Sequence, residues 1–170
     1  MTPGGKHITF RPAPRFAFSH PAHFIAMGFG SGLAPFAPGT VGTLVALPLW
    51  WVLAPGYGAL AVLLLCVPLF AIGVWACDLT GRHLGIGDHG SMVWDEVVAF
   101  LAILAVIPDD WRWQTAAFFL FRAFDVVKPP PIRNLERRMK GGFGVMFDDI
   151  LAAGYTLLVL AVAQRILEAG

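Results

Sequence analysis

Apolar residues in this chain are gathered into long blocks that alternate with short polar or glycine- and proline-rich segments. The block from Ala59 to Cys77 contains no charged residue, and as a helix it would rise about 28 Å, close to the thickness of a bilayer core. The other apolar blocks are residues 44–54, 93–107, 115–127 and 145–167. With 57% hydrophobic and only 14% charged residues, the composition lies outside the range of soluble domains. The pattern therefore predicts an all-α integral membrane bundle of four to five apolar segments.

Residues 24–43, FIAMGFGSGLAPFAPGTVGT, are rich in glycine and proline, and we expect this N-terminal loop not to form one simple helix. Leu33 stands where a dinucleotide-binding G-x-G-x-x-G motif needs glycine, and the lysine of a P-loop is missing. Two interpretations stay open. The backbone N–H groups could form a nest that holds a phosphate, or the stretch could be a re-entrant turn that only leads the chain into the membrane.

The N-terminal residues 1–23 carry Lys6, Arg11 and Arg15 among several prolines. No apolar run follows closely enough for a signal peptide. We therefore expect a flexible basic lead-in, followed by a single membrane-embedded domain over residues 24–170.

Lysine and arginine are concentrated in this lead-in and in residues 78–92 and 128–144, whereas the short turns between the other apolar blocks carry fewer of them. The positive-inside rule then places these three segments on the cytoplasmic side of the membrane. The net charge of the whole chain is only +1, and no basic stripe with interleaved aromatic residues occurs. We therefore expect no nucleic-acid partner.

Acidic residues lie at the ends of apolar blocks that this topology places on the cytoplasmic side. They are Asp88, Asp95, Glu96, Asp125, Asp148 and Asp149. A carboxylate carried toward the bilayer centre costs roughly 2.5 to 3.5 kcal/mol, so such groups need ion-pair partners, water or a metal ion. Carboxylate oxygens suit a hard divalent cation such as Mg²⁺. The sequence thus predicts that these acids converge on a shared metal site.

Simpler interpretations exist for parts of this set. Arg122, Asp125 and Lys128 recur every three residues and could form an ion-pair ladder along one helix face. Asp148 and Asp149 could merely stabilise the N-terminus of a helix. A small ion- or proton-coupled transporter is the alternative class of function, and it requires acids that are accessible from both sides of the membrane. A third class is a non-catalytic scaffold whose basic linker binds anionic lipid.

Four separated blocks resemble motifs of the phosphatidylglycerophosphatase A family. They are GFGSGLAPFAPGTVGT, DHGSMVWDE, FRAFDVVKPPPI and GGFGVMFDDILAAG. The resemblance implies a Mg²⁺-dependent phosphatase, a multi-pass protein of the bacterial inner membrane. It would remove the terminal phosphate of phosphatidylglycerophosphate at the cytoplasmic face and give phosphatidylglycerol.

This resemblance also suggests roles for individual residues. Catalytic roles are expected for Asp95, Glu96 and Asp149, with metal-activated water as the attacking group and Asp95 or Glu96 as its general base. The expected substrate-binding residues are Gly30, Ser31, Thr40, Arg122, Lys128 and Arg133. The oligomeric state stays open.

Overall fold

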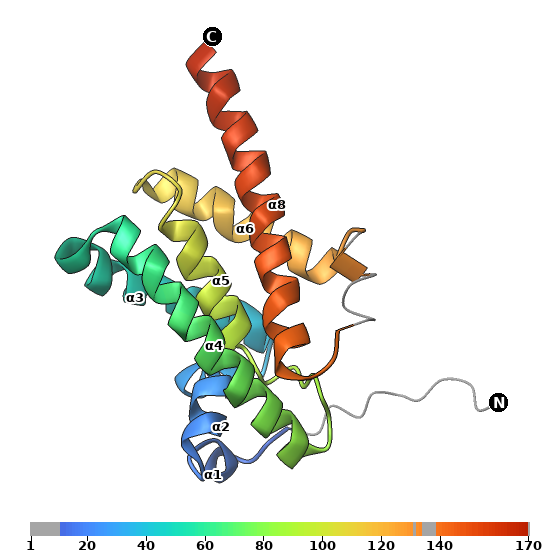
Figure 1. The fold of residues 1–170 in the computed structure, drawn as a ribbon. Coiled ribbons are helices and arrows are strands. Elements are labelled where there is room, and N and C mark those ends of the chain that lie inside the picture. The colour runs from blue at the N-terminus through green and yellow to red at the C-terminus, as the bar shows by residue number, and fades with distance from the viewer. Residues whose placement is uncertain (1–10, 131, 134–138, 170) are drawn as a thin grey trace.

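The computed structural model describes residues 11–130, 132–133 and 139–169, and the regular elements of that part of the chain are all helices (Figure 1). In chain order they are α1 (Pro14–Ala17), α2 (Pro21–Ala26), the 3-10 helix η1 (Gly28–Leu33), α3 (Pro38–Tyr57), α4 (Ala59–Leu84), α5 (Trp94–Leu104), α6 (Trp111–Val127) and α8 (Gly141–Ala169). The predicted all-α class is confirmed.

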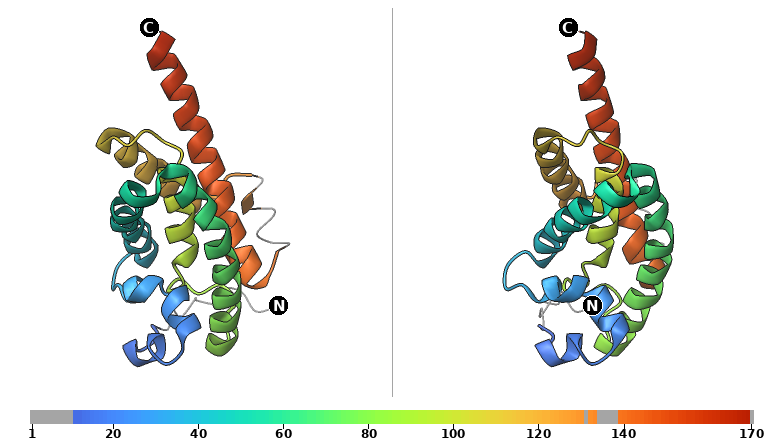
Figure 2. Two further views of the ribbon diagram at one scale, coloured as in Figure 1. Left: turned by 60° about the vertical axis from the view of Figure 1, so that its left-hand side comes forward. Right: turned by 90° about the vertical axis from the view of Figure 1, so that its left-hand side faces the viewer.

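Three of the described helices, α3, α4 and α8, are long and apolar enough to cross a membrane. Large apolar side chains are exposed on them, among them Leu64 on α4 and Leu158 on α8, as lipid contact requires. The second half of α8 extends beyond the other helices (Figure 2). The remaining apolar blocks form the shorter helices α5 and α6. A helical membrane protein is therefore supported, whereas the count of four to five segments stays a prediction.

Helix α5 lies at the centre of the bundle, where α3, α4 and α8 all pack against it (Figure 1). Every residue of α5 except Ala102 is buried. Phe100 is fully enclosed, and its ring centroid lies 5.8 Å from that of Phe121 on α6. Gly42 allows α3 to come close, since a Cβ there would lie only 2.7 Å from the Cβ of Val93. The first turn of α5 is therefore held by packing on several sides.

The helix ends differ from the predicted block boundaries at both sides of α3 and at the end of α4. Helix α3 begins at Pro38, inside the glycine- and proline-rich stretch, because proline at the first helical positions needs no N–H donor. The turn predicted around residues 55–58 is reduced to Gly58, which has φ 80° and ψ 160°. Helix α4 continues past Cys77 to Leu84, and Gly85 ends it in the left-handed conformation.

The described part of residues 1–23 contains α1 and the start of α2, and α2 packs against α4. His23 of α2 is buried and stacks on Phe16 with ring centroids 4.1 Å apart, and its Nε2 lies 2.8 Å from Nδ1 of His83 on α4. Burial lowers the pKa of His23, which favours the neutral ring. Residues 1–10 lie outside the described residues, as do 134–138 of the basic linker.

Candidate metal and phosphate site

The central helix, α5, has two buried acidic residues near its start. Asp95 and Glu96 occupy the first turn of α5, and each is only 8% exposed. An acid is favoured at a helix N-terminus by the helix dipole, by about 0.3 to 1 kcal/mol. This gain does not offset the cost of burying two adjacent carboxylates, so the pair needs a further positive partner.

Asp149 joins this pair from the third turn of α8, and it is 3% exposed. Since α8 begins at Gly141, Asp148 and Asp149 do not lie at its N-terminus, and the interpretation that they stabilise a helix N-terminus is wrong. One oxygen from each of Asp95, Glu96 and Asp149 can be chosen so that all three lie within 4.8 Å of one another. Asp95 Oδ1, Glu96 Oε2 and Asp149 Oδ2 are buried without a hydrogen-bond partner among the described residues. Three buried carboxylates this close together, each with an oxygen that lacks a donor among the described residues, fit a hard divalent cation, and Mg²⁺ in particular prefers carboxylate ligands. We call Asp95, Glu96 and Asp149 the acid cluster.

Helix α6 brings a cation to the edge of the acid cluster. Arg122 Nη1 lies 2.6 Å from Asp125 Oδ2 and 3.5 Å from Glu96 Oε1. Asp125 in turn lies beside Asp149. The Nε of Arg122 is buried and has no hydrogen-bond partner in the described part of the chain, which leaves it a donor for a ligand oxygen.

The predicted ion-pair ladder along α6 stops after its first step. Helix α6 ends at Val127, and Lys128 adopts a left-handed conformation with φ 46°. Its side chain therefore leaves the helix face and forms an ion pair with Asp148 of α8. Lys128 thus holds the acid next to Asp149 and does not continue the row formed by Arg122 and Asp125.

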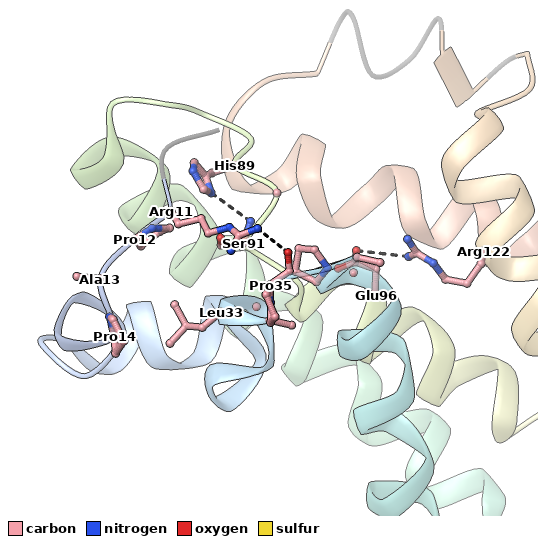
Figure 3. Close-up of a pocket in the computed structure, with 16 residues that line it drawn as sticks. Arg11, Pro12, Ala13, Pro14, Leu33, Pro35, His89, Ser91, Glu96 and Arg122 are labelled. Carbon is pink, nitrogen blue, oxygen red and sulfur yellow. Dashed lines mark hydrogen bonds and ion pairs between the residues drawn. The ribbon is translucent and has the colours of Figure 1, made fainter. Parts of the chain in front are cut away.

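A cavity of about 730 Å³ opens beside the acid cluster (Figure 3). Glu96 and Arg122 line one part of it, together with the N-terminus of α3 at Pro38 and Gly39. Gly39 is buried, and a Cβ there would overlap Glu96 Oε1 and lie 3.1 Å from Arg122 Nη2. The absence of a side chain at Gly39 therefore makes room for the ion pair.

Several predicted residues lie elsewhere. Gly30, Ser31 and Thr40 are not among the residues that line this cavity, and Ser31 Oγ donates to the carbonyl of Gly28 at 2.7 Å. Other parts of the glycine- and proline-rich stretch, residues 32–35 and 37–39, line it instead. Asp88, Arg133 and Asp148 line a second cavity of about 530 Å³, together with Lys140.

The site residues predicted from the sequence do not include Gly39, His89 and Arg11, which also line this cavity. His89 is buried, and its Nδ1 accepts a hydrogen bond from the Ser91 backbone N–H at 3.1 Å. The position of His89 beside Asp88 in a polar loop was the only signal for it. A glycine or a terminal arginine gives no comparable signal.

Comparisons with known proteins show which family this chain resembles. Two relatives are named phosphatidylglycerophosphatase A: one from Haemophilus influenzae is 42% identical over 90% of this chain and 94% of its own length, and one from Escherichia coli is 43% identical over 81% and 80%. A Bacteroides thetaiotaomicron protein, provisionally named phosphatidylinositol-3-phosphatase, is 42% identical over 84% of this chain and 93% of its own length. No solved structure matches. Since the family model for phosphatidylglycerophosphatase A matches residues 24–164, this chain belongs to the phosphatidylglycerophosphatase A family.

Proposed function

We propose that this protein hydrolyses the terminal phosphomonoester of phosphatidylglycerophosphate, giving phosphatidylglycerol and inorganic phosphate. The observation that carries the proposal is the convergence of Asp95, Glu96 and Asp149 beside a cavity that Arg122 also lines. The two relatives named phosphatidylglycerophosphatase A support this substrate.

Each group at the acid cluster has a role in this reaction. Arg122, fixed between Glu96 and Asp125, would bind the phosphate oxygens and keep their charge balanced as the bond to the leaving group breaks. Asp95 or Glu96 would take the proton of the attacking water. Asp95, Glu96 and Asp149 would hold Mg²⁺, which when bound supplies positive charge that stabilises the transferring phosphoryl group.

Phosphate release by the purified protein in detergent tests the proposal. With phosphatidylglycerophosphate and Mg²⁺ we expect turnover, and excess chelator should lower the rate by at least about 100-fold, because the acid cluster would then be left uncompensated. Adding Mg²⁺ back should restore the rate. Turnover that persists in excess chelator would contradict the metal role, and no release in the presence of Mg²⁺ would contradict the function itself.

Phosphatidylinositol 3-phosphate is the informative second substrate, because a relative carries the corresponding name. Both lipids present a phosphomonoester on a polyol head group that is joined to diacylglycerol through a phosphodiester. We expect turnover of phosphatidylglycerophosphate to be the faster of the two. The opposite ranking would keep the phosphatase class and reassign the substrate.

We further propose that α5 and α6 complete a set of four to five apolar segments in the inner membrane, with the acid cluster on the cytoplasmic side. The basic residues support this orientation, since Arg11, Arg15 and Arg82 all belong to segments on the same side as the acid cluster in the predicted topology. The turn before α6 would then lie on the periplasmic side.

Cysteine labelling in intact spheroplasts checks this orientation. Ile86 in the loop before α5 and Trp111 at the start of α6 are both exposed, whereas the native Cys66 and Cys77 are buried. A membrane-impermeant maleimide should modify the Trp111→Cys variant and leave Ile86→Cys unmodified until the membrane is broken. Labelling of Ile86→Cys in intact spheroplasts would place the acid cluster on the outer side.

A further inference from the structure

Arg11 lines the same cavity as Glu96 of the acid cluster, although it precedes the family match, which begins at residue 24. The residue is exposed, and its guanidinium Nη2 donates to the carbonyl of Pro35 at 2.5 Å. This contact ties the N-terminal segment to the loop before α3. A guanidinium has five N–H donors, so the bond to Pro35, the one hydrogen bond of this side chain within the described residues, leaves others for a ligand.

The cavity therefore has an arginine toward each end. In Figure 3, Arg11 and His89 lie toward one end and Glu96 and Arg122 toward the other, with Pro35 between them. Apolar residues, including Pro12 and Leu33, complete the lining near Arg11. An anionic group that occupies the Arg11 end would thus lie beside apolar surface and away from the acid cluster.

Phosphatidylglycerophosphate has two phosphates that match this arrangement. The terminal phosphomonoester is the group that reacts, and the inner phosphodiester joins the glycerol head group to the diacylglycerol. If the monoester lies at the acid cluster, the diester lies one glycerol unit further out, nearer the acyl chains. The charge of the diester persists in the product, so its contact contributes to binding and not to bond breaking.

We propose that Arg11 binds the phosphodiester of the lipid and thereby selects substrates that carry this second phosphate. The assignment rests on the proposed function, which places the monoester at the acid cluster. The bond to Pro35 holds the guanidinium over the cavity before the lipid arrives, which lowers the entropic cost of the contact. Arg11 is thus a specificity-determining residue and does not take part in the chemical step.

Binding of dihexanoyl phosphatidylglycerol, measured by titration calorimetry in detergent, tests this inference without turnover. This probe has the phosphodiester and lacks the monoester. Arg11→Ala should raise its Kd about tenfold, the loss expected for one charge-assisted contact, and Arg11→Lys should raise it less. Arg15→Ala is the matched control, since Arg15 is exposed on the neighbouring α1 and does not line the cavity. Its Kd should equal that of the wild type.

Kinetics give the second measurement. For phosphatidylglycerophosphate, Arg11→Ala should raise KM about tenfold and leave kcat within about twofold, and inhibition by inorganic phosphate should not change. The inference is overturned by a wild-type Kd in Arg11→Ala, by equal losses in Arg15→Ala, or by a fall in kcat at constant KM. Wild-type protein that binds phosphatidylglycerol but releases no phosphate would contradict the proposed function alone, because the binding test of Arg11 needs no turnover.

Discussion

Asp95→Asn and Asp149→Asn are each expected to lower kcat by about 1000-fold or more while the protein stays folded. Asparagine has nearly the same shape as aspartate, so the packing around α5 and α8 is kept, but the negative charge that would bind Mg²⁺ is lost. Phosphate release from phosphatidylglycerophosphate at saturating Mg²⁺ measures the effect. Asp78→Asn is the control, because Asp78 pairs with Arg82 on α4 and does not belong to the acid cluster.

Thermal unfolding without metal separates loss of the site from loss of the fold. The acid cluster brings three carboxylates together in a buried place, so removing one charge relieves repulsion. We expect the Tm of both variants without Mg²⁺ to equal or exceed that of the wild type, and the rise in Tm on adding Mg²⁺ to shrink. Wild-type turnover in either variant would remove that residue from the site. A large fall in Tm without metal would assign it a structural role.

Much of the fold could be predicted because apolar blocks of membrane length leave the backbone few options. In lipid every N–H and C=O must be paired within the segment, so blocks such as residues 59–77 and 145–167 become helices. The helix ends were less predictable. Proline inside a helix usually breaks it, yet Pro48 and Pro55 both lie within α3. Tertiary packing and the membrane together outweigh the local preference of these residues.

An energetic argument also predicted that these acidic residues belong to a site. Charge next to an apolar block is costly, so the presence of Asp95, Glu96 and Asp149 indicated a compensated site before their distances were known. Sequence spacing could not show, however, which of the predicted acids belong to the acid cluster. Asp148 turns toward Lys128 and the second cavity, whereas its neighbour Asp149 belongs to the acid cluster. That division depends on where α6 ends, which is a tertiary result.

Residues that act through their small size or through a contact distant in sequence could not be identified from the sequence alone. Gly39 lies in a glycine-rich stretch, and the sequence does not show which of its glycines belongs to the site. Ser31 and Thr40 of the same stretch carry hydroxyl groups and were therefore the more obvious candidates. Only the packing of α3 against α5 shows that position 39 faces Glu96 and Arg122. A site residue that contributes empty space cannot be found by searching for functional groups.

Gly39→Ala should therefore lower kcat/KM about 100-fold, although it adds a single methyl group. The new Cβ would overlap Glu96 Oε1 and lie 3.1 Å and 3.2 Å from the two terminal nitrogens of Arg122. These are the far ends of flexible side chains, so they can move aside and the fold can survive. This movement shifts the side chains of Glu96 and Arg122 away from their positions at the cavity. A misplacement of a catalytic group by about 1 Å lowers the rate about 100-fold. Steady-state phosphate release measures the loss.

Gly154→Ala on α8 is the matched control, because nothing lies within 4 Å of the Cβ it would add. Alanine in place of a helical glycine stabilises a protein by about 0.4 to 1 kcal/mol when space allows, so this variant should be fully active and slightly more stable. A comparable Tm for both variants, with activity lost only in Gly39→Ala, would locate the effect in the site. Full activity in Gly39→Ala would mean that Glu96 and Arg122 need not hold their positions for turnover, and that the geometry at the N-terminus of α3 does not set the rate.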